Sequence, residues 1–268
     1  MLFRGFPLAR LVPVLLVATG AVVVASPRGE CGHLDVLPFL SSGKILTGGH
    51  SDLDDITVES VSVFGYDFGE DPNDPWFIGD PGFNNGSAFT TAFPNSGALP
   101  SLTVLSLTVA AGSYGPLHYW DGNGAVNFAP VGQGVEINLN KGSGNLRIGA
   151  NTLSGTLAVG QTNASGRIHQ HIQSSIGSGG SGQSFTTLGA PDGLYAMGIL
   201  LSSGGFSSDP IYIVYNVNMS ETIHDAGIAW FETHVVPEPS TTTLSAAGLL
   251  LVAGFRHARR GLSRRSRN

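Results

Sequence analysis

Cysteine is almost absent from this chain of 268 residues, which contains only Cys31. A single thiol cannot form an intramolecular disulfide, and it excludes the paired-cysteine motifs that bind metals or exchange electrons. The fold must therefore be held together by its buried core. Arg28 occupies the position at which lipoprotein signals place a leucine, so lipid attachment at Cys31 is not expected.

Positive charge is scarce in the middle of the chain, because eight of the 13 basic residues lie near the two ends. All 19 acidic residues fall between Glu30 and Glu238, so the stretch between the two basic ends has a net charge of about −14. Such a segment is not expected to bind nucleic acid or an anionic membrane, but it attracts cations. The five central basic residues are Arg28, Lys44, Lys141, Arg147 and Arg167.

Motifs of the common enzyme classes are also missing. The sequence has no Gly-x-Ser-x-Gly turn, no His-Glu-x-x-His and no glycine-rich phosphate loop. A non-catalytic protein is therefore expected. A hydrolase remains an alternative, and it would need two facing carboxylates about 5–10 Å apart in a cleft.

The N-terminus has the three parts of a secretory signal peptide. Arg4 and Arg10 provide positive charge, residues 11–24 are apolar, and small residues up to Ala25 precede Ser26. This pattern predicts a cleaved signal helix over residues 1–25 and export of the remaining chain.

The C-terminus, residues 236–268, also has three parts. The segment Val236-Pro237-Glu238-Pro239-Ser240 comes first, and its prolines prevent a helix from continuing into the body. Residues 240–255 are then sixteen uncharged residues, fewer than the roughly 20 that span a bilayer comfortably. A cluster of arginines ends the chain: Arg256, Arg259, Arg260, Arg264, Arg265 and Arg267.

This tail closely resembles the PEP-CTERM sorting signal of Gram-negative bacteria that produce exopolysaccharide. The resemblance implies that an exosortase recognises the Pro-Glu-Pro box and removes the tail, including its short transmembrane helix. The protein would then be membrane-inserted before processing and would reach the cell envelope, cell surface or extracellular matrix. The alternative is a plain C-terminal anchor with a basic stop.

The body, residues 26–235, is predicted to be one all-β domain. Glycine reaches 38 residues, about twice its usual share of roughly 7%. No segment keeps a helical apolar period for three turns, and apolar residues such as Ile211 and Ile213 recur at every second position. These features favour a single β-sandwich, jelly-roll or immunoglobulin-like, with Val135, Ile137, Leu139, Ile211, Ile213 and Tyr215 pointing inward. The strands are expected at 56–64, 102–109, 131–139, 146–148, 153–159, 194–201, 211–217 and 227–231.

Histidine provides the strongest candidate site. In an extended chain, His33 and Asp35 share one face, and so do His169 and His171. Two such pairs on neighbouring strands could bind one zinc ion, since zinc takes three or four nitrogen, oxygen or sulfur ligands. His50 is a possible fourth ligand. The alternative is that these histidines are solvated residues on an exposed strand.

A second resemblance supports the metal site. The Gly-His-x-Asp-Val segment at 32–36, the central His-x-His and residues 191–197 are similar to bacterial surface-anchored repeat proteins linked to metal uptake and to zinc-regulated PEP-CTERM proteins. In those relatives an aromatic-rich strand often follows His-x-His, whereas here residues 173–176 and a glycine-rich loop intervene. His118, His224 and His234 are expected to be ordinary surface or edge residues.

Two further groups of side chains suggest weaker alternatives. Trp76, Phe77, Tyr119 and Trp120 would stack on sugars if exposed, which makes a glycan-binding module of the exopolysaccharide layer the second candidate function. An acidic run offers oxygen ligands suited to calcium, although the EF-hand spacing is absent and a solvated loop is favoured. Its members are Asp67, Glu70, Asp71, Asn73, Asp74 and Asp80.

Overall fold

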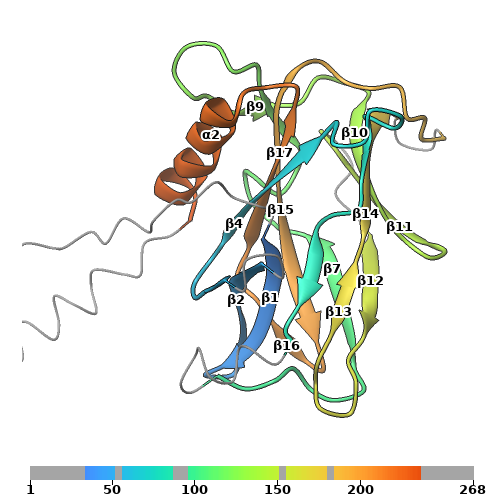
Figure 1. The fold of residues 1–268 in the computed structure, drawn as a ribbon, viewed down its shortest axis with the longest axis vertical. Helices are drawn as coiled ribbons and strands as arrows, with labels where there is room; N and C mark the ends of the chain where they lie inside the picture. Colours follow the sequence, from blue (N-terminus) through green and yellow to red (C-terminus); the bar gives the residue numbers. More distant parts are fainter. Residues whose placement is uncertain (1–33, 52–55, 87–95, 151–154, 180–183, 237–268) are drawn as a thin grey trace, which may run out of the picture. The chain divides into compact units, whose positions relative to one another are not determined.

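The computed structural model describes residues 34–51, 56–86, 96–150, 155–179 and 184–236 (Figure 1). The expected signal helix, Cys31, His33 and the sorting segment from Pro237 onward, with its hydrophobic helix, lie outside these residues. The described chain is mostly β: seventeen strands form three sheets, and one helix follows the last strand.

The first sheet contains five strands in the order β13-β6-β1-β2-β3. Its β1–β2 hairpin turns through Ser42 and Gly43, whose φ angles of 52° and 79° fit a two-residue hairpin loop. β6 pairs with β1 in parallel and with β13 antiparallel, so it joins the N-terminal hairpin to a strand from the middle of the chain. The strands are β1 (Asp35–Ser41), β2 (Lys44–Ser51), β3 (Ile56–Val58), β6 (Gly82–Asn84) and β13 (His169–His171).

The second sheet has four strands in the order β11-β10-β14-β5. A buried carboxylate of Glu136 on β10 accepts hydrogen bonds from Arg147 on β11, with a distance of 2.8 Å from Nε to Oε2. The pair keeps the charge of Glu136 compensated inside the fold. The strands are β5 (Phe77–Ile78), β10 (Val135–Lys141), β11 (Gly144–Gly149) and β14 (Gln173–Ser178).

The third sheet has the order β12-β7-β15-β17-β4, with β8, β9 and β16 attached at its margins. Its strands β17 and β4 pair in parallel although they are far apart in the sequence. The strands are β4 (Val63–Phe68), β7 (Val104–Val109), β8 (His118–Trp120), β9 (Ala129–Pro130), β12 (Thr156–Gln161), β15 (Gly193–Ser203), β16 (Phe206–Ser207) and β17 (Ile211–Val217).

One hydrophobic core contains side chains from all three sheets, including Val36, Leu139 and Ile213. The expected inward residues on β10 and β17 are confirmed, since all of them are buried in this core except Val135, which is half-buried against it. The expected strand segments, apart from 227–231, overlap strands of the structure.

The expected strand at 227–231 is wrong, because these residues belong to helix α2 (Glu221–His234). The helix buries His224, Gly227 and Phe231, which follow helical spacing. Two of these three buried positions are a histidine and a glycine, so the helical period is not visible as a pattern of apolar residues. A Cβ on Gly227 would clash with Leu194 of β15, so glycine permits the close approach of the helix.

Helix α2 also explains why the second face of β17 is not solvated. Figure 1 shows the helix beside β17 and β4. Phe231 packs in a second cluster with Tyr212 and Val214, which alternate with the inward residues of β17. The strand is therefore buried on both faces, in contrast to a strand with one face in water.

Candidate metal centre

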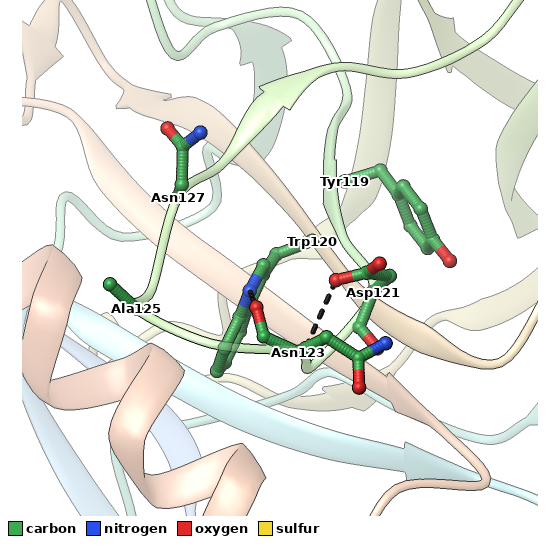
Figure 2. A pocket seen from close by; sticks show the side chains of 6 residues that line it. All are labelled: Tyr119, Trp120, Asp121, Asn123, Ala125 and Asn127. Atoms are coloured by element: carbon green, nitrogen blue, oxygen red, sulfur yellow. Dashed lines mark hydrogen bonds between the residues drawn. The ribbon is translucent and has the colours of Figure 1, made fainter.

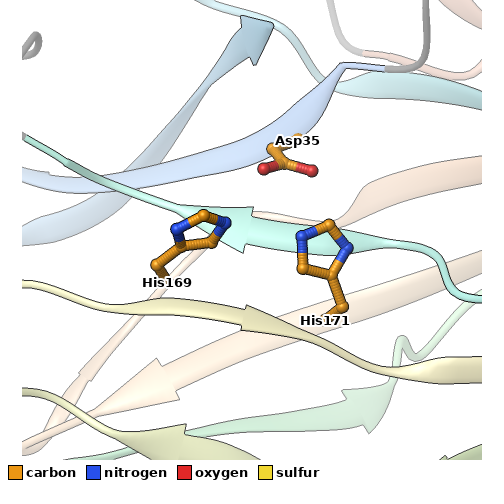
Figure 3. A group of neighbouring side chains, drawn as sticks. All are labelled: Asp35, His169 and His171. Atoms are coloured by element: carbon orange, nitrogen blue, oxygen red, sulfur yellow. The ribbon is translucent and has the colours of Figure 1, made fainter. Parts of the chain in front are cut away.

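Three predicted ligands come together on the first sheet. Asp35 is the first residue of β1, and His169 and His171 are the two ends of β13. One ligand atom from each residue lies within 4.8 Å of the other two. Figure 3 shows the two imidazole rings with ring nitrogens facing each other beneath the carboxylate of Asp35.

Strand β6 lies between these residues, and a glycine on it makes their approach possible. His171 is paired with Gly82, and the neighbouring pair Val36–Phe83 places Asp35 beside the same glycine. A Cβ on Gly82 would clash with the carboxylate of Asp35 and would lie 2.8 Å from Cε1 of His171. The missing side chain therefore provides the space in which a carboxylate and two imidazoles meet above the strand.

A second carboxylate orients one of the histidines. Oδ1 of Asp80 lies 3.3 Å from Nδ1 of His171. Hydrogen bonding at Nδ1 leaves Nε2 of the same ring as the metal-binding atom, an arrangement common around metal-ligating histidines. The amine of Lys141 donates to the carbonyl oxygen of His171 at 2.7 Å, which fixes the backbone of β13.

Two buried tyrosines surround the carboxylates. The hydroxyl of Tyr66 donates to the carbonyl oxygen of Leu34 at 2.9 Å, directly before Asp35. Burial raises the pKa of Tyr66 well above its ordinary value, and the negative charges of Asp80 and Asp35 raise it further. Tyr215 shares a 2.7 Å hydrogen bond with Ser174, whose hydroxyl also donates to the carbonyl oxygen of Asp80. Asp35 and Asp80 thus lie beside two buried, hydrogen-bonded tyrosines.

The ligand set differs in part from the one expected. His33 lies outside the described residues. His50 is paired with Asp35 across the β1–β2 ladder, but its Nδ1 is hydrogen-bonded to Oγ1 of Thr57 at 3.0 Å. Within the described part of the chain, His50 does not join the group of Asp35, His169 and His171. Asp35 is buried, whereas both histidines of β13 are exposed and open to an arriving ion.

The remaining histidines depart from expectation in two of three cases. His234 is exposed at the end of α2, as expected. His118 and His224 are instead buried, with exposed fractions of 5% and 2%. Each has a partner that explains its burial: Nδ1 of His118 is 3.0 Å from the carbonyl oxygen of Pro116, and Nε2 of His224 is 3.0 Å from that of Val214.

The acidic run does not form one calcium loop. Asp71 accepts a hydrogen bond from the backbone N–H of Asn73 at 2.8 Å, which makes a local turn. Asp67 is instead 3.2 Å from His224, and Asp80 is next to His171. Among the described residues, no three carboxylates of this run share a ligand group.

Two of the expected aromatic residues, Tyr119 and Trp120, line a small pocket, and the other two, Trp76 and Phe77, are half-buried. A pocket of about 270 Å³ is lined by Tyr119, Trp120, Asp121, Asn123, Ala125 and Asn127 (Figure 2). Trp120 is only 6% exposed, and its indole N–H donates to the carbonyl oxygen of Asn123 at 3.3 Å. The hydroxyl of Tyr119 donates to the carbonyl oxygen of Asp192 at 2.7 Å.

No protein-family model, curated protein or solved structure matches this chain. Its function is therefore argued from the residues themselves. In the described part of the chain, no helix is both long enough and apolar enough to cross a membrane. Asp80 was expected only as a member of the acidic run, and Gly82 was not expected at all, because only the pairing of β6 with β1 and β13 brings this segment to the histidines.

Proposed function

We propose that this chain is an exported, non-catalytic protein of the cell envelope or extracellular matrix that binds a divalent metal ion, preferably zinc. The observation that supports metal binding is the convergence of Asp35, His169 and His171 within 4.8 Å. Two imidazole nitrogens and one carboxylate oxygen are a common protein ligand set for zinc, with a fourth position for water or another ligand.

The surroundings of the site agree with this proposal. Asp80 bonds the far side of His171, and the central part of the chain has a large excess of acidic residues. Because the two histidines are exposed, an ion can bind without unfolding the sheet. The non-catalytic role rests on the sequence, which contains none of the common hydrolase motifs.

Calorimetric titration of the metal-stripped protein with zinc tests the site. Loss of a residue that only supports a ligand typically weakens metal binding about 10–100-fold. The double variant His169→Ala/His171→Ala removes two ligands, so its zinc affinity should fall by more than this. The variant His234→Ala removes an exposed histidine outside the site and should bind zinc as the native protein does. Equal affinity in the double variant and the native protein would eliminate this site.

The destination of the protein rests on its two ends. We propose that residues 1–25 are a signal helix, that 236–268 are a PEP-CTERM signal processed by an exosortase, and that the sheets between them form a single β-sandwich. Intact-mass measurement of protein extracted from the cell surface should show loss of both ends. Recovery of the arginine-rich tail in most molecules would favour the plain membrane anchor.

Glycan binding is the second candidate, and the pocket beside Tyr119 favours it. The backbone N–H of Asn123 donates to Asp121 and lowers the pKa of its carboxyl group, which therefore remains a hydrogen-bond acceptor for sugar hydroxyls. Titration with the exopolysaccharide of the producing cell should show binding that Asp121→Asn weakens. If that variant binds as the native protein does, the pocket is not a glycan site.

A further inference from the structure

A second group of possible metal ligands lies on the third sheet, near the C-terminal ends of the parallel strands β4 and β17. Asp67 is in β4, and Glu221 and His224 are in the first turns of α2. Glu221 and His224 are three positions apart, so both side chains lie on one face of the helix. One ligand atom of each of the three residues lies within 4.8 Å of the others.

His224 provides an independent indication that this group binds a cation. The residue is only 2% exposed, and its Nε2 lies 3.0 Å from the carbonyl oxygen of Val214. Because a carbonyl oxygen only accepts, Nε2 must have the hydrogen. In the neutral ring, Nδ1 then presents a lone pair. That atom is buried and makes no hydrogen bond of good geometry among the described residues, although Oδ1 of Asp67 lies 3.2 Å from it.

The surroundings of Nδ1 are negative. A carboxylate oxygen of Asp67 lies 3.2 Å away, and Glu221 is the other acidic member of the group. A lone pair facing a carboxylate is repulsive unless a positive charge lies between or on them. The helix N-terminus contributes only about half a positive elementary charge, less than the two carboxylates contribute in negative charge.

The group also has a supporting residue. Nδ2 of Asn216 donates to Oδ1 of Asp67 at 2.6 Å and to the carbonyl oxygen of Met219 at 3.0 Å. Oδ1 of Asn216 accepts from the backbone N–H of Met219 at 2.9 Å. One amide therefore orients the carboxylate and fixes the chain just before α2 begins, as residues around metal ligands commonly do.

We propose that Asp67, Glu221 and His224 form a second metal site, which binds a first-row divalent ion and fastens helix α2 to strand β4. One imidazole and two carboxylates suit manganese, iron or zinc, whereas calcium takes oxygen ligands only. The site is separate in sequence and in sheet from Asp35, His169 and His171, so either can exist without the other.

The test uses the full chain in the His169→Ala/His171→Ala background, which lacks the first site. Titration with manganese chloride should still show one binding event. Adding Glu221→Gln should weaken that event at least about 10-fold, whereas Glu232→Gln, which makes the same charge change farther along α2, should not. Glu221 is exposed, so its substitution tests binding without removing a buried side chain. Equal binding in all three proteins, or none in the background protein, would overturn the proposal.

A second measurement distinguishes a metal ion at Nδ1 of His224 from a proton on the same atom. Manganese is paramagnetic, and it should broaden the amide resonances of Ile223 and His224 in the same background. An Nδ1 nitrogen resonance of His224 typical of a protonated ring, unchanged by manganese, would mean that a proton alone occupies the position. That result would overturn the second site and leave the first untouched, because the first has its own titration.

Discussion

Gly82 shows at the scale of one residue how a site can depend on an absent side chain. Its substitution by alanine should destabilise the protein by about 1–3 kcal/mol, the usual result of forcing extra atoms into packed space. The added Cβ would clash with the carboxylate of Asp35, so zinc affinity should fall as well. Urea denaturation and zinc titration measure the two effects.

The matched control for this variant is Gly79→Ala. Apart from its own chain neighbours, no residue has an atom within 4 Å of a Cβ built on Gly79, so its substitution should leave stability and zinc affinity nearly unchanged. If Gly82→Ala behaves like Gly79→Ala in both measurements, Asp35 is not held where the metal site requires it.

Asp80 provides the other prediction at this scale. Replacing it with asparagine removes the charge beside Nδ1 of His171 and should weaken zinc binding about 10–100-fold. The exposed Asp74→Asn variant makes the same change outside the site and serves as the control. An unchanged zinc affinity in Asp80→Asn would show that the carboxylate does not orient the ligand.

The sequence predicted Asp35, His169 and His171 because alternate residues of a strand share a face. It could not predict Asp80 or Gly82, since their roles arise from the pairing of β6 with strands at residues 35–41 and 169–171. His50, expected as a possible fourth ligand, lies opposite Asp35, but its Nδ1 is hydrogen-bonded to Oγ1 of Thr57 on β3.

At the scale of the element, helix α2 depends on one aromatic anchor. Phe231 is completely buried, with ring centroids of Phe128 and Tyr212 at 4.9 and 5.4 Å. Phe231→Ala should lower the free energy of unfolding by about 3–5 kcal/mol. Chemical denaturation followed by circular dichroism measures it, with the exposed Thr233→Ala on the same helix as control. If Phe231→Ala lowers the free energy of unfolding by no more than Thr233→Ala does, α2 is not firmly packed against the sheet.

Strands were easier to predict than this helix. Apolar residues at every second position between glycine-rich turns identify strands directly. The helix instead contacts the sheet through His224, Gly227 and Phe231, and only the last is a large apolar residue. The segment 227–231 is short and apolar, and such a segment alone does not distinguish a strand from a buried helix.

At the scale of the whole molecule, buried phenols make the protein sensitive to alkali. Tyr66, Tyr195 and Tyr215 are almost completely buried, and burial raises the pKa of each in the folded state. In the unfolded chain they ionise near the free value of about 10. Folding stability from these groups is therefore complete below about pH 10 and is lost as the pH rises further.

Titration of tyrosinate absorbance in the near ultraviolet measures this effect. These three phenols should ionise only together with unfolding, as recorded by circular dichroism. Reversible ionisation of all six tyrosines in a protein that stays folded would contradict the packing described for the third sheet.

The parallel pairing of β4 with β17 also governs when the protein can fold. Strand β4, residues 63–68, cannot pair until strand β17, residues 211–217, is available. The chain between these two strands makes up most of the body. Contacts so distant in sequence form slowly, because a long loop must be ordered before they are made. In a chain emerging from the ribosome, this sheet cannot close until residues 211–217 have been synthesised. The export proposed above would therefore act on a chain whose largest sheet is still open.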